Sequence, residues 1–383
     1  MRASYNIGLI RGDGIGPEVV REGIKVLERV ASGYDFKLDW HDFPISAETY
    51  LKRGVLMTDQ ELDDLSKSAA IYFGAMGDPR VPEKVLQGGG ILRLRFHFDQ
   101  YINLRPAKLY RGVETPLKDK RPGQIDFQVV RENSEDFYVG LGGRFRGSEH
   151  DFHLDLKRRL YEAQFSVNAK VEPDEELGFQ MGVMSGTGAE RVLRYGFELA
   201  RRKGAKRVTV VDKFNVLSDI YGVWRDRADL VAKDYPEIQY EFAFVDAVTQ
   251  WFVRRPEWYQ IVIAPNTFGD IITDLAAAVV GGMGIAPGGN INPERKYPSM
   301  FEPIHGSAPK YAGQKVANPV ATILAGAMML EFLGEGKAAK TVEEAVEFVL
   351  AEGKYRTYDL GGSSKTNEVG DAVAAAVDRM AGK

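Results

Sequence analysis

Two aspartates four residues apart, Asp270 and Asp274, are the most informative pair in this sequence. They follow the apolar run Ile261–Ala264, and the residues around them favour a helix with Thr267 as its expected N-cap. At this spacing both carboxylates lie on one helical face, where they repel each other and favour a cation between them. Carboxylate oxygens suit a hard divalent ion such as Mg²⁺ or Mn²⁺. The simpler interpretation is that Asp270 complements the helix dipole and Asp274 is solvated.

Three arginines, Arg95, Arg105 and Arg131, provide groups that would bind an anion. Arg105 lies between Leu104 and Pro106, and Arg131 follows two valines; in such apolar surroundings an unpaired charge is expensive. A dicarboxylate ligand would neutralise these guanidinium groups through bidentate hydrogen bonds. The alternative for each of them is an ordinary surface salt bridge.

Composition narrows the class of protein. The chain has 383 residues, of which 44% are apolar and 27% charged, a composition typical of a soluble globular protein of two domains or one large α/β unit. A net charge of −4 and the absence of a dense Lys/Arg run give no indication of nucleic-acid binding. The lack of cysteine excludes disulfides and thiolate chemistry. No signal-peptide pattern and no apolar stretch of membrane-spanning length is present, so we expect no membrane partner and a cytoplasmic location.

Strand-like and helix-like runs alternate along the chain, which predicts an α/β fold with a largely parallel sheet and helices on both faces. The predicted helices include 187–203, 216–234, 267–280 and 319–333, and Thr58 with Glu61 forms a capping box. Gly12, Gly14 and Gly16 have the spacing G-x-G-x-G, which is not the dinucleotide-binding fingerprint. A Rossmann fold is therefore not expected.

Seven segments together resemble the metal-dependent β-decarboxylating dehydrogenases, the family that includes isopropylmalate, isocitrate, homoisocitrate and tartrate/D-malate dehydrogenases. The resemblance runs from about residue 5 to about residue 378, and the tartrate/D-malate and isopropylmalate branches are the most similar. The segments are Arg11–Glu18, Leu94-Arg95, Asn103–Pro106, Val130–Asn133 with Tyr138, Asp212–Asn215, Pro265–Asp274 and Phe301–Pro309.

The resemblance implies an isopropylmalate-dehydrogenase-like fold with two domains. The large, discontinuous cofactor-side domain is expected at 1–100 and 281–383, and the small domain for substrate binding and dimerisation at 101–280. The family carries an arm in the small domain that pairs with a second subunit. Here the corresponding segment, about 144–180, is longer and more charged than usual. It either extends that interface or is a flexible surface insertion.

Residue roles also follow from the resemblance. The metal ligands would be Asp246, Asp270 and Asp274, and the substrate would bind Ile91, Leu92, Arg95, Arg105 and Arg131. Lys213 would take the hydroxyl proton and Tyr138 would protonate C3 after decarboxylation. Lys213 and Asp246 would reach the active site from the second subunit, so the implied enzyme is a homodimer or a higher oligomer.

The cofactor site implied by the resemblance has an unusual feature. NAD-using members have an aspartate directly after the His-Gly-Ser-Ala-Pro motif, whereas this chain has Lys310 and Tyr311. A lysine there would attract the 2′-phosphate of NADP, and Tyr358 matches a tyrosine of NADP-using isocitrate enzymes, so NADP is favoured over NAD. The complete expected cofactor set is Asn215, Glu302, His305, Gly306, Ser307, Ala308, Lys310, Tyr311, Asn318 and Tyr358.

The expected reaction is NAD(P)-dependent oxidative decarboxylation of a 2-hydroxy dicarboxylic acid to a 2-keto acid and CO₂. Ile91 and Leu92 cannot hydrogen-bond a third carboxylate, which disfavours isocitrate and leaves acids of the D-malate, tartrate or 3-isopropylmalate type. The alternatives are an isocitrate or homoisocitrate dehydrogenase and a non-enzymatic dicarboxylate-binding or assembly protein. Metal-dependent phosphoryl transfer is disfavoured because no P-loop is present.

Overall fold

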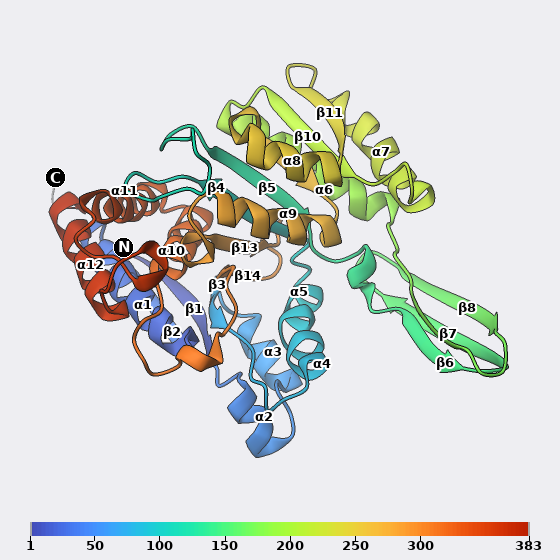
Figure 1. Cartoon of the computed structure of the whole chain (residues 1–383). Helices are drawn as coiled ribbons and strands as arrows, with labels where there is room; N and C mark the ends of the chain where they lie inside the picture. Colours follow the sequence, from blue (N-terminus) through green and yellow to red (C-terminus); the bar gives the residue numbers. More distant parts are fainter. Residues whose placement is uncertain (1, 382–383) are drawn as a thin grey trace. The chain divides into compact units, whose positions relative to one another are not determined.

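The computed structural model describes residues 2–381, which fold into two compact units (Figure 1). Unit 1 comprises the chain up to Val129, Trp251–Trp258 and the segment from Thr273 onward. Unit 2 comprises Val130–Gln250 and Tyr259–Ile272. The chain thus passes between the units near residues 130, 250, 258 and 272, whereas the predicted breaks lie near 100 and 281. The first difference has a clear cause, because the strand that follows residue 100 pairs within unit 1.

Unit 1 is built on a mixed, mainly parallel set of strands. Its strand order is β4-β13-β14-β3-β1-β2, in which β13 runs antiparallel to both neighbours and the pairs β14–β3, β3–β1 and β1–β2 are parallel. The strands are β1 (Ala3–Gly12), β2 (Phe36–Asp42), β3 (Ala70–Ala75), β4 (Ile102–Lys108), β13 (Pro287–Ile291) and β14 (Ser299–Pro303).

Helices cover both faces of these strands, because the fully buried strand β3 needs apolar partners on each side. Ile71 and Phe73 pack into one cluster with residues of the shorter helices, while Tyr72 points the other way and donates to the Thr322 carbonyl at 2.7 Å. The shorter helices are α2 (Ala47–Arg53), α3 (Asp59–Leu65), α4 (Glu83–Leu86) and α5 (Leu92–His97). The longer helices, which pack on one another, are α1 (Gly16–Gly33), α10 (Val320–Leu333), α11 (Gly336–Glu352) and α12 (Thr366–Ala381).

Unit 2 contains the parallel strands β10 and β11 and the parallel pair β10–β12, with β5 next to β12 in strand order. Helices α6 and α7 pack together, and α6 also packs on β10 and β12. The strands are β5 (Asp126–Glu132), which begins in unit 1, and β10 (Arg207–Asp212), β11 (Gln239–Phe244) and β12 (Ile261–Ala264). Helices α6 (Gly186–Lys203) and α7 (Ser218–Ala232) belong wholly to unit 2, whereas α8 (Val245–Arg254) and α9 (Asn266–Val279) begin in unit 2 and end in unit 1.

The α/β prediction is confirmed, as is a mainly parallel sheet that differs in strand order from a Rossmann sheet. The capping box of Thr58 and Glu61 is present at the start of α3. The predicted N-cap of α9 is wrong: the helix begins at Asn266, so Thr267 lies inside its first turn. Within residues 2–381, no helix combines the length and the apolar character that a membrane span requires.

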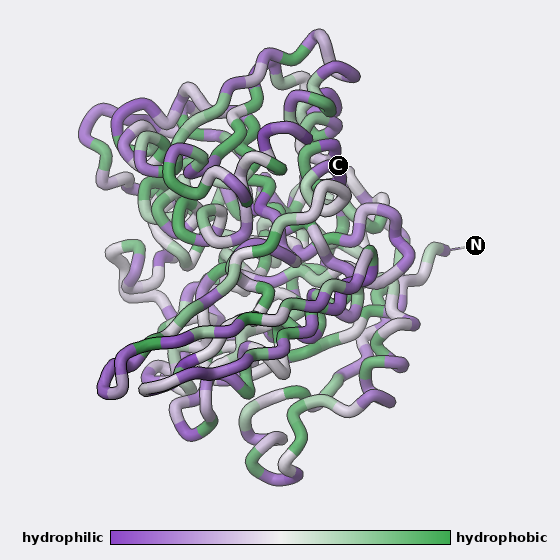
Figure 2. The backbone as a smooth tube through the Cα atoms, turned by 90° about the vertical axis from the view of Figure 1, so that its right-hand side faces the viewer, coloured by the Kyte–Doolittle hydropathy of each residue, from purple (hydrophilic) through white to green (hydrophobic). Residues whose placement is uncertain are grey.

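The arm of unit 2 consists of two antiparallel pairs, β6 (Gly142–Arg146) with β9 (Glu176–Gln180), and β7 (Glu149–Lys157) with β8 (Glu162–Lys170). Along β7 and β8, exposed residues alternate with half-buried or buried ones, and hydrophilic and hydrophobic residues alternate along the tube in Figure 2. At the turn between β7 and β8, Arg158 Nε donates to the Ser134 carbonyl at 2.7 Å. This bond ties the arm to the turn that follows β5.

Two buried carboxylates lie at the end of β5 and in that turn, namely Glu132 and Glu135. Glu132 accepts hydrogen bonds from the amides of Ser134 (2.7 Å) and Glu135 (2.9 Å). Glu135 accepts from the Ser185 amide (2.8 Å) and hydroxyl (2.6 Å), and Ser185 caps α6. Burial, together with the nearby charge of Glu135, raises the pKa of Glu132 to about 7 in spite of the hydrogen bonds to its carboxylate. The turn therefore links β5 to the start of α6 through ionisable groups.

Gly112 should be irreplaceable for a steric reason that Gly123 lacks. Both have φ near +80° (82° and 84°), but a Cβ at Gly112 would lie 2.0 Å from the Leu350 carbonyl oxygen, whereas one at Gly123 would meet nothing within 4 Å. Gly123→Ala should destabilise the fold by about 1–2 kcal/mol through backbone strain. Gly112→Ala should destabilise the fold by the same backbone strain and by about 1–3 kcal/mol more for the clash. Urea denaturation measures both losses. Equal losses would show that the α11 backbone moves aside.

Glu132 should make stability depend on pH. Its folded pKa of about 7 lies above the ordinary glutamate pKa of 4.5, so its contribution to stability is fully present below pH 4.5 and is lost as the pH rises through 7. The stability of Glu132→Gln relative to the native chain should therefore improve from pH 4.5 to 8, by an amount on the order of 2 kcal/mol. Urea denaturation across this range measures it, with the exposed Glu28→Gln as control. A constant difference would contradict the raised pKa.

Candidate active site

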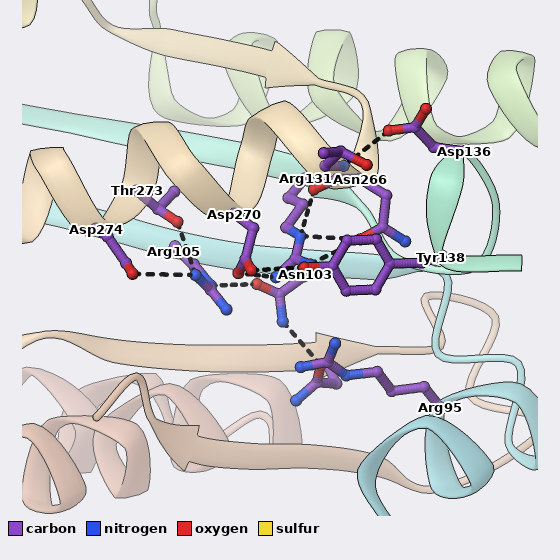
Figure 3. Close-up of polar contacts among 12 residues, drawn as sticks. Arg95, Asn103, Arg105, Arg131, Asp136, Tyr138, Asn266, Asp270, Thr273 and Asp274 are labelled. Atoms are coloured by element: carbon purple, nitrogen blue, oxygen red, sulfur yellow. Dashed lines mark hydrogen bonds and ion pairs between the residues drawn. The ribbon is translucent and has the colours of Figure 1, made fainter. Parts of the chain in front are cut away.

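Helix α9 presents Asp270 to a buried arginine of unit 2. Arg131, which is 1% exposed, donates from Nη1 to Asp270 Oδ1 at 2.5 Å, and Tyr138 donates to Asp270 Oδ2 at 2.7 Å (Figure 3). Arg131 Nε and Nη2 also donate to the side-chain oxygen of Asn266, at 3.1 and 2.7 Å. The Arg131 guanidinium lies 5.1 Å from the centre of the Tyr138 ring. One carboxylate thus joins a predicted substrate-binding residue to a predicted proton donor.

Gly269 makes this arrangement possible. A Cβ at this position would lie 2.5 Å from Arg131 Cγ and 2.8 Å from its Cβ. The arginine stem therefore lies directly against the α9 backbone, and Asp270 can meet the guanidinium from the next residue of the helix.

The second aspartate of the helix meets a second buried arginine, within unit 1. Arg105 Nη1 donates to Thr273 Oγ1 at 2.7 Å and lies 3.9 Å from Asp274 Oδ1 (Figure 3). Arg105 Nε donates to Asn103 Oδ1 at 2.6 Å, and Asn103 in turn donates to Asn290 at 2.7 Å. Buried polar groups from β4, β13 and α9 therefore fix the direction of the Arg105 side chain.

Glu302 and Arg95 continue this network. The Glu302 carboxylate accepts from Asn290 at 2.6 Å and lies 3.4 Å from Arg95 Nη2, and both charged residues are buried. Glu302, expected to bind the cofactor, here anchors a predicted substrate-binding arginine. This contact gives Glu302 a structural role in addition to any contact with a ligand.

The donor chemistry of α9 fits a hard divalent cation. Asp270 and Asp274 have side chains 36% and 56% exposed, while their arginine partners are buried, so carboxylate oxygens remain accessible to an ion. Asp246 instead forms an ion pair with Lys213 at 2.6 Å. Over residues 2–381 of this single chain, no group of three or more His, Cys, Asp or Glu residues is arranged to hold a metal.

Lys213 is held at the end of β10 by a buried carboxylate beside it. Asp212 accepts from Arg225 Nε at 2.6 Å and Nη2 at 3.0 Å, and from the Phe214 amide at 2.9 Å. The Arg225 guanidinium also lies over the rings of Phe214 and Phe242, at 4.6 and 4.7 Å. The hydrogen bond and the charge of Lys213 lower the pKa of Asp246. Lys213 is therefore anchored through its backbone and faces a carboxylate that is ionised at neutral pH.

The expected cofactor residues of unit 1 form a second cluster around the short helix η5 (Pro309–Tyr311). Lys310 Nζ lies 4.7 Å from the centre of the Tyr311 ring, and the Tyr311 and Tyr358 rings are 5.6 Å apart. The hydrogen bond from Tyr358 and the nearby Lys310 lower the pKa of Tyr311. The same hydrogen bond raises the pKa of Tyr358 to about 12. Asn318 donates to Asp359 at 3.0 Å, next to Tyr358.

The His305–Ala308 segment has the features of a ligand-binding loop. His305 Nε2 is buried and has no hydrogen-bond partner among the described residues, and burial lowers the pKa of the imidazole. Ala308 has φ of 38°, a left-handed conformation that is rare for a residue with a Cβ. The Ser307 carbonyl accepts from the Ile15 amide at 2.8 Å, and a Cβ at Gly14 would lie 1.9 Å from it. An unsatisfied buried donor or acceptor and a glycine-lined backbone both fit a dinucleotide ligand.

Three predicted residues lie outside these clusters. Asn215 is exposed beyond β10, whereas Gly306 is exposed within the His305–Ala308 loop. Ile91 is half-buried and packs on the core cluster of unit 1, next to half-buried Leu92. Sequence reasoning missed Asp136, Asn103, Asn266, Thr273 and Arg225. Apart from Asn103, which lies two residues before Arg105, these partners are 13 to 168 positions away from the residues they hold, so local spacing gives no signal for them.

Comparisons with known proteins agree with this geometry. The family model for isocitrate/isopropylmalate dehydrogenase matches residues 6–373. D-malate dehydrogenase [decarboxylating] of Escherichia coli (strain K12) is 42% identical, over 99% of this chain and 100% of its own length. 3-Isopropylmalate dehydrogenase of Streptomyces coelicolor is 43% identical, over 98% and 99%. The crystal structure of isocitrate dehydrogenase from Methylococcus capsulatus superposes with a TM-score of 0.80 at 33% identity, covering 98% of this chain and 99% of that one.

The match extends over nearly the whole chain in all three cases, and it includes every segment on which the resemblance was based. The expected reaction class is therefore confirmed, and isocitrate as the substrate is not favoured. The chain belongs to the isocitrate/isopropylmalate dehydrogenase family, and it is an oxidoreductase that acts on a hydroxy acid with decarboxylation.

Proposed function

We propose that this chain is a metal-dependent, nicotinamide-dinucleotide-dependent decarboxylating dehydrogenase for a 2-hydroxy dicarboxylic acid of the D-malate, tartrate or 3-isopropylmalate type. The observation that carries the proposal is the pattern on α9, where two accessible carboxylates each meet a buried arginine. The carboxylates provide hard oxygen ligands for Mg²⁺ or Mn²⁺, and the arginines provide donors for an anionic substrate.

The substrate carboxylates bind to Arg95, Arg105 and Arg131 in this proposal. These three arginine side chains are buried, so the directions of their N–H donors are fixed before the ligand binds. Little side-chain freedom is therefore lost on binding. Each is already hydrogen-bonded to a neutral or acidic partner of its own unit, which keeps the charge tolerable before substrate binds.

Two side chains handle protons. A divalent ion bound by Asp246, Asp270 and Asp274 would supply Lewis-acid stabilisation of developing negative charge. Lys213 takes the proton from the C2 hydroxyl as hydride leaves for the nicotinamide. Tyr138, whose hydroxyl is held at Asp270, gives a proton to C3 after CO₂ has left.

The segment that begins with Gly88 supports a substrate with a small or apolar C3 substituent. A Cβ at Gly88 or Gly89 would meet nothing within 4 Å, and the half-buried side chains of Ile91 and Leu92, which follow, are apolar. An apolar wall of this kind accepts a hydrogen atom, a hydroxyl or an alkyl group at C3, but offers no partner to a third carboxylate. This observation favours the malate and isopropylmalate types over isocitrate and homoisocitrate.

Lys213 and Asp246 act in the active site of a second copy of the chain in this proposal. The support comes from exposed apolar residues around them, namely Phe214 (36% exposed), Val216 (68%) and Phe244 (36%), and from Ile271 (58%), which follows Asp270 on α9. Apolar side chains gathered around charged functional groups are typical of a surface that a partner covers. A homodimer with shared active sites accounts for both features.

The preferred cofactor in this proposal is NADP. Lys310 brings a positive charge to the Tyr311–Tyr358 pair, and the Tyr311 hydroxyl, which accepts from Tyr358, can donate its own proton to a phosphate. A 2′-phosphate at this position would be neutralised by the lysine, whereas the ribose of NAD would gain no equivalent contact.

The function is tested by a panel of D-malate, tartrate, 3-isopropylmalate, isocitrate and homoisocitrate, assayed for CO₂ release with NAD and NADP plus Mn²⁺. Asp270→Asn and Asp274→Asn should each lower turnover by at least about a hundredfold through lost Lewis-acid stabilisation, and should weaken Mn²⁺ binding in calorimetric titration. The exposed Asp63→Asn is the control. Dicarboxylate binding without turnover, or full turnover in EDTA, would refute the enzymatic proposal.

The shared site is tested by mixing two inactive variants. Lys213→Ala and Tyr138→Phe chains, after subunit exchange, should recover about a quarter of native activity, because half of the dimers are mixed and each mixed dimer has one intact site. Exchange is verified by native mass spectrometry. If exchange proceeds and no activity returns, Lys213 and Tyr138 serve the same subunit.

The cofactor preference is tested with a charge reversal. The native chain should favour NADP over NAD by about tenfold in kcat/KM, the lower end of what one charge-assisted contact gives. Lys310→Asp should reverse this preference, because a like charge would then face the 2′-phosphate. Lys337→Asp, an exposed lysine of α11, makes the same charge change elsewhere. A native chain that uses NAD as well as NADP would refute the role of Lys310.

A further inference from the structure

Asp136 has a backbone conformation that a residue with a Cβ rarely adopts. It has φ of 62° and ψ of −143°, and it is fully buried two residues before Tyr138. Reciprocal hydrogen bonds with Val183, at 2.8 and 3.2 Å, hold its backbone in place. Glycine would enter this region without strain, so the aspartate side chain must offset an unfavourable backbone.

The side chain of Asp136 bonds to the start of α9. Its Oδ2 accepts from the Thr267 amide at 2.7 Å, and its Oδ1 accepts from the Tyr221 hydroxyl at 3.0 Å. Thr267 is the second residue of the helix, so its N–H has no acceptor within the helix. A carboxylate from a separate segment thus performs the capping that the sequence pattern assigned to Thr267.

The same short segment meets α9 a second time. Tyr138 donates to Asp270 Oδ2 at 2.7 Å, one helical turn beyond Thr267. Asp136 and Tyr138 are joined by a single residue, Phe137, within the short helix η2 (Phe137–Val139) that follows Asp136. The bond at Thr267 therefore sets the distance and direction from which the Tyr138 hydroxyl approaches Asp270.

We propose that Asp136 is a positioning residue for Tyr138: its carboxylate fixes the start of α9 to the segment that carries the tyrosine, and so holds the tyrosine hydroxyl at Asp270. This inference rests on the proposed role of Tyr138 as proton donor. It assigns to Asp136 no contact with substrate, cofactor or metal. The opposing hypothesis is that the buried carboxylate only stabilises the fold.

A double-mutant cycle separates the two hypotheses. Asp136→Ala should lower kcat by about tenfold to a hundredfold, the effect expected of a misplaced catalytic group, and should leave the substrate KM nearly unchanged. In a Tyr138→Phe background the same substitution should lower kcat by less than about twofold, because the group that it positions is gone. Losses that multiply in the double variant would overturn the proposal.

Asp136→Gly removes the carboxylate but relieves the backbone, so it keeps the test valid if Asp136→Ala folds poorly. The kcat of Asp136→Gly should be as low as that of Asp136→Ala, although its melting temperature should be higher. A kcat equal to that of the native chain would overturn the proposal. Asp35→Ala is the matched control, since Asp35 also has a positive φ (56°) but is exposed and lies in unit 1, and it should leave kcat unchanged.

Hydrogen–deuterium exchange supplies a readout that needs no turnover. Peptides that contain the Thr267 amide should exchange faster in Asp136→Ala than in the native chain, while peptides from the arm should not change. Unaltered exchange at the start of α9 would overturn the proposal even if no substrate were found. If Tyr138→Phe turns over as fast as the native chain, the proposed role of Tyr138 fails instead, and the two failures are thus distinguishable.

Discussion

A buried arginine that faces an accessible carboxylate is the contact on which the rest of the site depends. Arg131 cannot leave its position without breaking bonds to Asn266 and Asp270, and Asp270 also holds Tyr138. Removing one partner of a buried charge pair typically costs about 3–5 kcal/mol, because the remaining charge is left without compensation. The close packing of Gly269 against the arginine stem leaves no room for adjustment. The position of the tyrosine and the direction of the carboxylate are therefore set together.

The same solution recurs at other points of the fold. Arg225 holds Asp212 beside Lys213, and Arg105 is held by Asn103 and Thr273. In each case a buried polar partner fixes the backbone or the side-chain direction of a charged group of the site. Hydrogen-bond networks of this kind are rigid when every donor and acceptor has a partner. The proposed reaction requires such rigidity, because it depends on accurate placement of two carboxylates and of two proton-transferring groups.

Local sequence patterns predicted the parts of this structure that local physics determines. The capping box of Thr58, the pairing of strands with helices, and the placement of Asp270 and Asp274 on one helix all follow from spacing of a few residues. The contact between Asp136 and Thr267 joins residues 131 positions apart, and nothing in either neighbourhood indicates it. For this reason the sequence pattern assigned the capping of α9 to Thr267 itself. The unit boundaries were displaced for the same reason, since β4 pairs with β13 far along the chain.

The division of unit 1 into distant segments has a consequence for biosynthesis. Strand β3 pairs on one side with β1, but its other neighbour, β14, begins at Ser299. Unit 2 has all its residues once Ile272 has been made, whereas the first strands of unit 1 must wait for the last third of the chain. During that interval β3 is an open, wholly apolar sheet edge, the kind of surface that associates with other chains. Growing or truncated chains of this protein therefore depend on protection of that edge until residue 303 has left the ribosome.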